Sequence, residues 1–145
     1  HTPAKKPFAL PTQALKDAIA KEWVSGKKFS PANMPLTALA YTAIDQMDGN
    51  KENITEVLLA YVDTDTLSYR SSNQSLLERQ KKEWDPVLAW AGSKFNALWQ
   101  TTSGVMPIEQ PAALHDAIRA YLQSLDNMRL AACCTLASGY SSVVL

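Results

Sequence analysis

Apolar residues recur every three or four positions along most of the chain, which is the period of an amphipathic helix. The first stripe starts after Thr12, a good N-cap residue, and stops before Gly26, which suits the C′ position of a helix. A second stripe starts at Pro35, which suits a first helical turn, and stops at the turn signal Asp48-Gly-Asn50. A third runs from Ile54 to Val62. The first half of the chain therefore predicts three helices.

The next stripe is longer and raises a question. Ser72 or Asn73 can cap it, and it then runs straight through Pro86. Proline disfavours helical geometry at the residue before it, here Asp85, yet Asp-Pro also suits the N-cap and first position of a new helix. The pattern predicts either one kinked helix or two helices that meet at Asp85, with Asp85 explained as a cap.

Three further predictions cover the last third of the chain. Residues 99–110 contain Thr, Ser, Gly and Pro, and are expected to form a loop, after which Pro111 starts another helix. Residues 128–137 are apolar nearly all round, which is typical of a buried central helix. Ser138-Gly139 is expected to open a last helix. The chain is thus predicted to be all-α, with about six or seven helices.

The two ends differ in character from the rest. Residues 1–11 are polar and proline-rich, and are interpreted as a linker from a missing N-terminal domain. Residues 12–145 are interpreted as a helical domain, truncated at its C-terminal end because the sequence stops within the apolar run Val143-Val-Leu145.

The amino-acid composition argues against several classes of function. The chain of 145 residues carries 14 basic and 14 acidic residues, and this balance argues against nucleic-acid binding. No apolar run reaches the roughly 18 residues of a membrane span. The cysteines, Cys133 and Cys134, are adjacent and do not form a disulfide framework, which favours a reducing compartment.

The candidate metal-binding and catalytic motifs of the sequence are either incomplete or have a simpler interpretation. Asp63-x-Asp65 and Asp48-x-Asn50 open like calcium loops, but the required glycine is absent from each, and no zinc spacing occurs. No Gly-rich phosphate loop is present, so neither a cofactor nor a small-molecule ligand is expected. His115 could serve a serine hydrolase, although a histidine on a helix surface is the simpler interpretation.

The segment 77–91 combines acidic and basic residues with two tryptophans. Glu78 and Lys82 have the spacing of a surface ion pair, as do Arg79 and Glu83. Trp84 lies on the apolar stripe, whereas Trp90 lies off it. The residues expected to form structural core are Trp23, Leu77, Trp84 and Leu88. The segment is either a packing joint or a protein-binding patch in which tryptophan and arginine act as anchors.

A set of short motifs occurs in order along the chain. They are Leu10-Pro-Thr12, Glu22-Trp23, Met34-Pro-Leu-Thr-x-Leu-Ala40, Thr42-Ala-Ile-Asp45, Tyr69-Arg70, Arg79-Gln80, Trp84-Asp-Pro-Val-Leu-x-Trp-Ala91 and Gln110-Pro111. In this order the set resembles the Atp12-type chaperone family of mitochondria and alphaproteobacteria, which assembles the catalytic F(1) head of ATP synthase.

The resemblance implies a chaperone rather than an enzyme, which binds the free α subunit and prevents its aggregation until β subunits arrive. It also implies a β-rich N-terminal domain that this chain lacks. The residues best suited to contact the client or another domain are Tyr69, Arg70, Arg79, Asp85 and Trp90. Bacterial cytoplasm is the expected location, with the mitochondrial matrix as the alternative. The competing interpretations are a small helical adaptor and, less readily, a hydrolase that uses His115.

Overall fold

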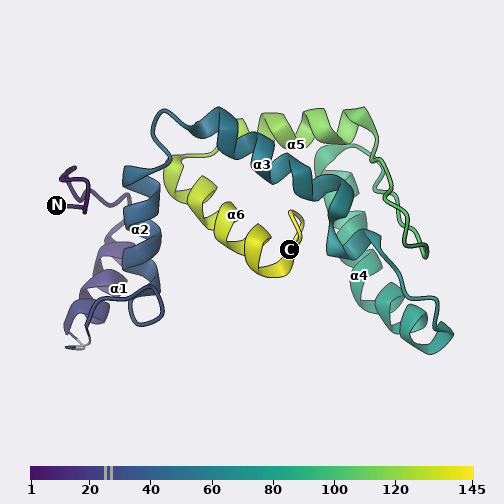
Figure 1. Ribbon diagram of the computed structural model, residues 1–145, viewed down its shortest axis with the longest axis horizontal. Coiled ribbons are helices and arrows are strands. Elements are labelled where there is room, and N and C mark those ends of the chain that lie inside the picture. The colour runs from purple at the N-terminus through teal and green to yellow at the C-terminus, as the bar shows by residue number, and fades with distance from the viewer. Residues whose placement is uncertain (25, 27) are drawn as a thin grey trace. The chain divides into compact units, whose positions relative to one another are not determined.

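The computed structural model describes residues 1–24, 26 and 28–145 (Figure 1). The described chain contains six α-helices and a single 3-10 turn, and its only β-pairing is an isolated bridge between Tyr69 and Thr102. The helices are α1 (Gln13–Val24), α2 (Pro35–Asp45), α3 (Lys51–Thr64), α4 (Gln74–Phe95), α5 (Ala112–Ser124) and α6 (Asn127–Tyr140), with η1 (Thr66–Ser68) between α3 and α4. The all-α prediction is confirmed.

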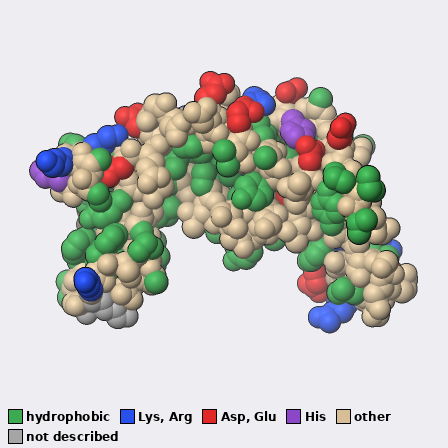
Figure 2. Space-filling view, viewed as in Figure 1, with side chains coloured by type: hydrophobic (Ala, Val, Ile, Leu, Met, Phe, Trp, Pro, Cys, Tyr) green, Lys and Arg blue, Asp and Glu red, His purple; other side chains and the backbone are tan. Residues whose placement is uncertain are grey.

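The chain divides into two compact units. The first comprises residues 1–51 and 125–132, and the second comprises residues 52–124 and 133–145. In the first unit, α1 and α2 lie side by side (Figure 1), and hydrophobic side chains remain visible on their surface (Figure 2).

Glu22 at the end of α1 caps the start of α2. Its carboxylate accepts hydrogen bonds from the backbone N–H of Leu36 and Thr37, both at 2.8 Å, and from the Thr37 hydroxyl at 2.7 Å. These N–H groups have no partner within the helix, and the N-cap residue itself, Met34, supplies no side-chain bond. Burial alone raises the pKa of Glu22, but the hydrogen bonds outweigh it and the pKa is lowered.

Trp23 was expected in the core and is instead 51% exposed. It lies in the last turn of α1, where Glu22 rather than Trp23 is directed at α2. Ile19, one turn earlier, is the buried residue of this helix. The expectation for Trp23 is wrong because its position on the stripe comes too late in the helix to be covered.

The segment 1–11 is attached to α2 of the same unit. The Thr2 hydroxyl donates to Asp45 at 2.6 Å, the Ala4 N–H donates to the same carboxylate, and Phe8 contacts the Tyr41 ring at 5.2 Å between centroids. The proposed domain boundary at residue 11 stays a prediction.

In the second unit α4 is one continuous helix, and Pro86 lies inside it. Asn73 caps it by accepting from the Leu76 N–H at 3.2 Å. Asp85 is therefore a residue of the helix interior and not a cap, which corrects that interpretation. Pro86 is exposed and has no N–H, so this turn of the helix lacks one backbone hydrogen bond.

Two expectations about α6 are also wrong. Ser138 and Gly139 do not open a new helix, because α6 continues through both to Tyr140, where Ser141 adopts a left-handed conformation with φ of 50°. Nor is α6 buried all round, since Leu136 is 46% exposed. Much of its apolar character comes from alanine and cysteine, small side chains whose partial exposure costs little.

Candidate functional site

Arg70 is positioned by the backbone pairing that follows η1. Its N–H donates to the Thr102 carbonyl at 2.7 Å, and the Thr102 N–H donates to the Ser68 carbonyl at 2.8 Å. This short parallel pairing fixes residues 68–70 beside the loop 101–103. Arg70 can therefore be held in one orientation although it lies outside any helix.

The guanidinium of Arg70 lies between α4 and that loop. Its Nη2 donates to Asp85 Oδ1 at 2.7 Å, and its Cζ lies 5.2 Å from the centroid of the Trp84 ring. The Arg70 side chain is 5% exposed and that of Asp85 is 56% exposed. The ion pair thus joins a buried cation to a carboxylate that still faces solvent.

Two nitrogen atoms of this guanidinium are unsatisfied. Nε and Nη1 of Arg70 are buried and have no hydrogen-bond partner among the described residues. A buried donor without a partner costs about 1–3 kcal/mol, and such groups are rare in native structures. Stacking on Trp84 offsets part of this cost, but provides no acceptor.

Gln110 holds the shape of the loop that connects α4 to α5, residues 96–111. Its Oε1 accepts from the Gln100 N–H at 2.9 Å, and its Nε2 donates to the Gln100 carbonyl and to the Ser68 hydroxyl. The Ser68 hydroxyl also accepts from Trp99 Nε1 at 2.7 Å. Two side chains of the loop thus meet at one hydroxyl, which explains how a segment without regular structure keeps its shape.

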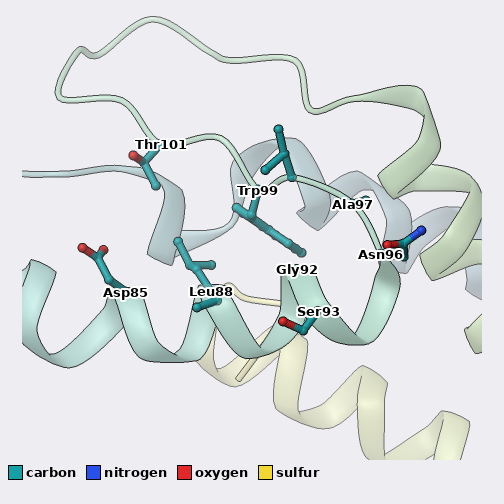
Figure 3. A pocket seen from close by; sticks show the side chains of 10 residues that line it. Asp85, Leu88, Gly92, Ser93, Asn96, Ala97, Trp99 and Thr101 are labelled. Atoms are coloured by element: carbon teal, nitrogen blue, oxygen red, sulfur yellow. The ribbon is translucent and has the colours of Figure 1, made fainter.

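A groove of about 620 Å³ runs along the C-terminal half of α4, between that helix and the loop. Figure 3 shows Asp85 and Leu88 rising from α4 toward Thr101, and the Trp99 ring above Gly92. Gly92 lets the chain turn closely here, because an added Cβ would lie 3.1 Å from the carbonyl oxygen of Ala97. Asp85 stands at one end of the groove and also lines a smaller hollow of about 260 Å³ beside Arg70, so it connects the two.

Arg79 and Trp90 lie on a different face of α4. Eleven residues at 100° each return to nearly the same direction, so these two side chains share a stripe about 120–140° from Asp85. Trp90 is 56% exposed and borders an apolar pocket of about 170 Å³ formed with α5, α6 and the C-terminal residues. The Lys94 amine lies 5.6 Å from the Trp90 ring and 4.7 Å from the Tyr121 ring.

The five residues predicted to contact a client therefore do not form one cluster. Arg70 and Asp85 are joined, whereas Arg79 and Trp90 lie on another face of α4. Tyr69 is half-buried, and its hydroxyl donates to the Asp63 carbonyl at 2.8 Å. Of the remaining predicted core residues, Leu88 is buried, while Leu77 and Trp84 are half-buried.

Sequence reasoning missed the loop side of the site. Thr101, Thr102 and Ser103 line the hollow beside Arg70 but carry no motif. The ion pair of Glu78 also differs from expectation, because Glu78 pairs with Lys81 at 3.2 Å rather than with Lys82. The loop itself was predicted at residues 99–110, and the motif Gln110-Pro111 was the signal that could have connected it to the site, because Gln110 holds the loop against Ser68.

His115 occupies a polar network rather than a nucleophilic site. Its Nε2 lies 3.0 Å from Asp63 Oδ1, and the same oxygen accepts from the Gln110 N–H at 2.7 Å. Across the described residues, no hydrogen bond joins a serine hydroxyl to the His115 ring. The geometry of a hydrolase triad is therefore not assembled around it.

Other chemistry finds little support in the structure. Within residues 1–24, 26 and 28–145, no three histidine, cysteine or acidic side chains group as metal ligands. In the same part of the chain, no helix has the length and apolarity to cross a membrane. Cys133 and Cys134 are unbridged, and burial raises the pKa of both thiols, which keeps them protonated and poorly nucleophilic.

Similarity to known proteins decides the family. The sequence pattern of the ATP12 chaperone protein matches residues 1–92. The chain belongs to the ATP12 chaperone family. The crystal structure of Atp12 from Paracoccus denitrificans is 36% identical, with a TM-score of 0.88 over 99% of this chain and 62% of that one. The D202K mutant of the same protein gives a TM-score of 0.89.

A curated ATP12 relative extends the match to a eukaryote. The mitochondrial protein atp12 of Schizosaccharomyces pombe is 29% identical in an alignment 145 positions long that covers 90% of this chain. This ATP12 chain spans about half the length of that relative, 50%, and 62% of the Paracoccus protein. These relatives are named as Atp12 proteins and the family as a chaperone protein, and none of these names denotes an enzyme.

Proposed function

We propose that the protein is a chaperone that binds the free α subunit of F-type ATP synthase and prevents its aggregation until β subunits arrive. The observation that carries this proposal is membership of the ATP12 chaperone family, with a solved relative that is 36% identical along 99% of the chain. The function needs no nucleotide, metal or covalent intermediate.

The physical task explains the kind of surface required. A subunit made for a hetero-oligomer exposes apolar interface before its partners arrive, and exposed apolar patches aggregate. A chaperone has to cover that surface and later release it, so its contact should be of moderate strength and partly polar. Competition by β subunits for the same surface then suffices for release.

Two surfaces of the second unit have this mixed character. The groove beside Asp85 and Leu88 combines a carboxylate with apolar side chains and an indole ring, that of Trp99. The pocket beside Trp90 is mainly apolar, with Lys94 at its edge. We propose both as client contacts, with Arg79 on the Trp90 stripe, since arginine and tryptophan are the residues that most often dominate binding energy.

The test is co-expression of the α subunit with and without the full-length chaperone, with soluble α subunit measured after sedimentation. We expect a gain in soluble subunit that Trp90→Ala reduces, and that Ala89→Arg, which places a large side chain in the groove beside Asp85, also reduces. Lys16→Ala, an exposed change on α1, should leave the gain intact. No gain with the wild-type chaperone would reject the function. A gain that neither variant reduces would retain the function and reject these surfaces.

An adaptor for assembled complexes predicts another result. It would co-purify with the complete F(1) head, whereas a chaperone should co-purify with unassembled α subunit alone. We propose bacterial cytoplasm as the protein's location, which the 36% identity to a bacterial protein supports. The mitochondrial matrix is the alternative.

A further inference from the structure

Arg70 lines a hollow beside α4, and its Nε and Nη1 are buried behind the ion pair with Asp85. The hollow has a volume of about 260 Å³ and is lined by Leu77, Lys81, Asp85 and the loop 101–103 as well as by Arg70. Nε and Nη1 of Arg70 donate to nothing among the described residues, and the side chain is 5% exposed. Guanidinium nitrogens are donors and never acceptors, so the group that completes this site must be an acceptor.

We propose that the hollow binds a carboxylate, carried by an acidic side chain of the polypeptide that the chaperone holds. This inference deepens the proposed function and rests on it. A guanidinium offers two forks, Nη1 with Nη2 and Nε with Nη2, so a carboxylate that replaces Asp85 on Nη2 can also accept from one of the unsatisfied nitrogens. Two such parallel, charge-assisted hydrogen bonds are each about twice as strong as hydrogen bonds between neutral groups.

The charges around the hollow favour a monoanion over phosphate. Arg70 and Lys81 supply two positive charges, and Asp85 and Glu78 supply two negative ones. Lys81 is already paired with Glu78 at 3.2 Å. A phosphate dianion would therefore meet two carboxylates without any surplus of positive charge, whereas one carboxylate adds a single charge next to unpaired donors.

Asp85 acts in this arrangement as the internal competitor of the ligand. It holds Arg70 through one oxygen, Oδ1, and its side chain is 56% exposed. An incoming carboxylate repels it, and the exposed side chain can rotate toward solvent while the ligand takes its place. Removing the charge of Asp85 should therefore strengthen ligand binding, while removing the fork of Arg70 should abolish it.

The opposite signs of these effects provide the test. In the full-length protein, the Nε–H signal of Arg70 is followed by NMR during titration with a short blocked peptide that contains one glutamate. Parallel titrations use the glutamine version of the peptide and inorganic phosphate, all at constant ionic strength. We expect the glutamate peptide to shift the signal and the other two to leave it in place.

Affinity for the α subunit is then measured for four variants. Arg70→Gln should weaken binding by at least about tenfold, and Arg70→Lys, which keeps the charge but loses the fork, by several-fold. Asp85→Asn should strengthen binding by about three- to tenfold. Arg129→Gln, a change of an arginine that is 76% exposed in the first unit, serves as the control and should have no effect.

Each outcome separates the inference from the function on which it rests. Weaker binding in both Arg70→Gln and Asp85→Asn would mean that the two residues form only a structural pair, and would overturn the inference while the chaperone function stands. An equal response to phosphate would overturn the carboxylate assignment. A wild-type protein that responds to the glutamate peptide but does not bind the α subunit would reject the proposed function and place the carboxylate on another client.

Discussion

Arg70 and Asp85 are 15 residues apart in sequence and share a hydrogen bond of 2.7 Å, with the arginine buried and the aspartate half-exposed. This asymmetry predicts unequal costs for removing either partner. Asp85→Ala leaves a buried cation without its anion, whereas Arg70→Met leaves a carboxylate that water can solvate. We expect losses in unfolding free energy of about 1–3 kcal/mol for Asp85→Ala, because exposure weakens the pair, and less for Arg70→Met. Urea titrations of both variants check this, and equal losses would contradict the asymmetry.

The period of the hydrophobic residues predicted the helices well, because each of α1 to α5 buries one apolar stripe. Asp85 shows where local rules stop: Asp-Pro satisfies the rules for a helix start, but α4 continues because residues on both sides of Pro86 lie on one packing stripe. Trp23 and Leu136 show a second limit, since periodicity marks a face but cannot say whether anything covers it.

The sequence predicted some residues of the candidate site but not how they contact each other. Arg70 and Asp85 were both selected from motifs, but their contact depends on the pairing of Tyr69 with Thr102, which is non-local and has no sequence pattern. The unsatisfied nitrogens of Arg70 depend on which acceptors lie nearby, and this too is a property of the folded chain.

Pro86 is the weak point of α4. It removes one backbone hydrogen bond from an exposed position of a 22-residue helix. Pro86→Ala restores the donor, and the intrinsic preference of about 3 kcal/mol for alanine exceeds the about 0.4–1 kcal/mol lost through a more flexible unfolded chain. We expect a net stabilisation of about 2 kcal/mol in thermal or urea unfolding. A loss of stability would mean that the kink itself is needed for packing.

The two tryptophans of α4 should differ in their contributions. Trp84 is half-buried beneath Arg70, whereas Trp90 is 56% exposed. Full burial of a large aromatic is worth about 3–5 kcal/mol on truncation, so we expect about 2–3 kcal/mol for Trp84→Ala and about 1 kcal/mol or less for Trp90→Ala. Urea titration of the two variants measures the difference, and equal losses would reject the assignment of faces.

Glu22 should make the chain less stable in acid. Hydrogen bonds from Leu36 and Thr37 lower its folded pKa despite burial, so the folded state binds a proton less readily than the unfolded state, whose glutamate pKa is about 4.3. Its contribution is present above that pH and is lost as the pH falls through the lower, folded pKa. Glu22→Gln should cost about 1 kcal/mol at neutral pH and less in acid. Unfolding by guanidinium chloride at several pH values measures this difference.

Asp65 should show the reverse pH dependence. It is fully buried and accepts hydrogen bonds from the Leu67 N–H at 2.9 Å, the Ser142 hydroxyl at 2.8 Å and the Val143 N–H at 2.7 Å. Burial raises its pKa, and these hydrogen bonds only partly oppose that rise.

The folded state therefore keeps the proton of Asp65 to a higher pH than the unfolded state, whose aspartate pKa is about 3.9. The stabilising contribution of this group is fully present below that pH and is lost as the pH rises through the folded pKa. Asp65→Asn removes the titration, although its single carbonyl oxygen cannot accept from all three donors. As the pH rises, the unfolding free energy of wild type should fall relative to that of Asp65→Asn. Over the same pH series it should rise relative to that of Glu22→Gln. If both differences change in the same direction, the raised pKa of Asp65 is wrong, and its three hydrogen bonds outweigh its burial.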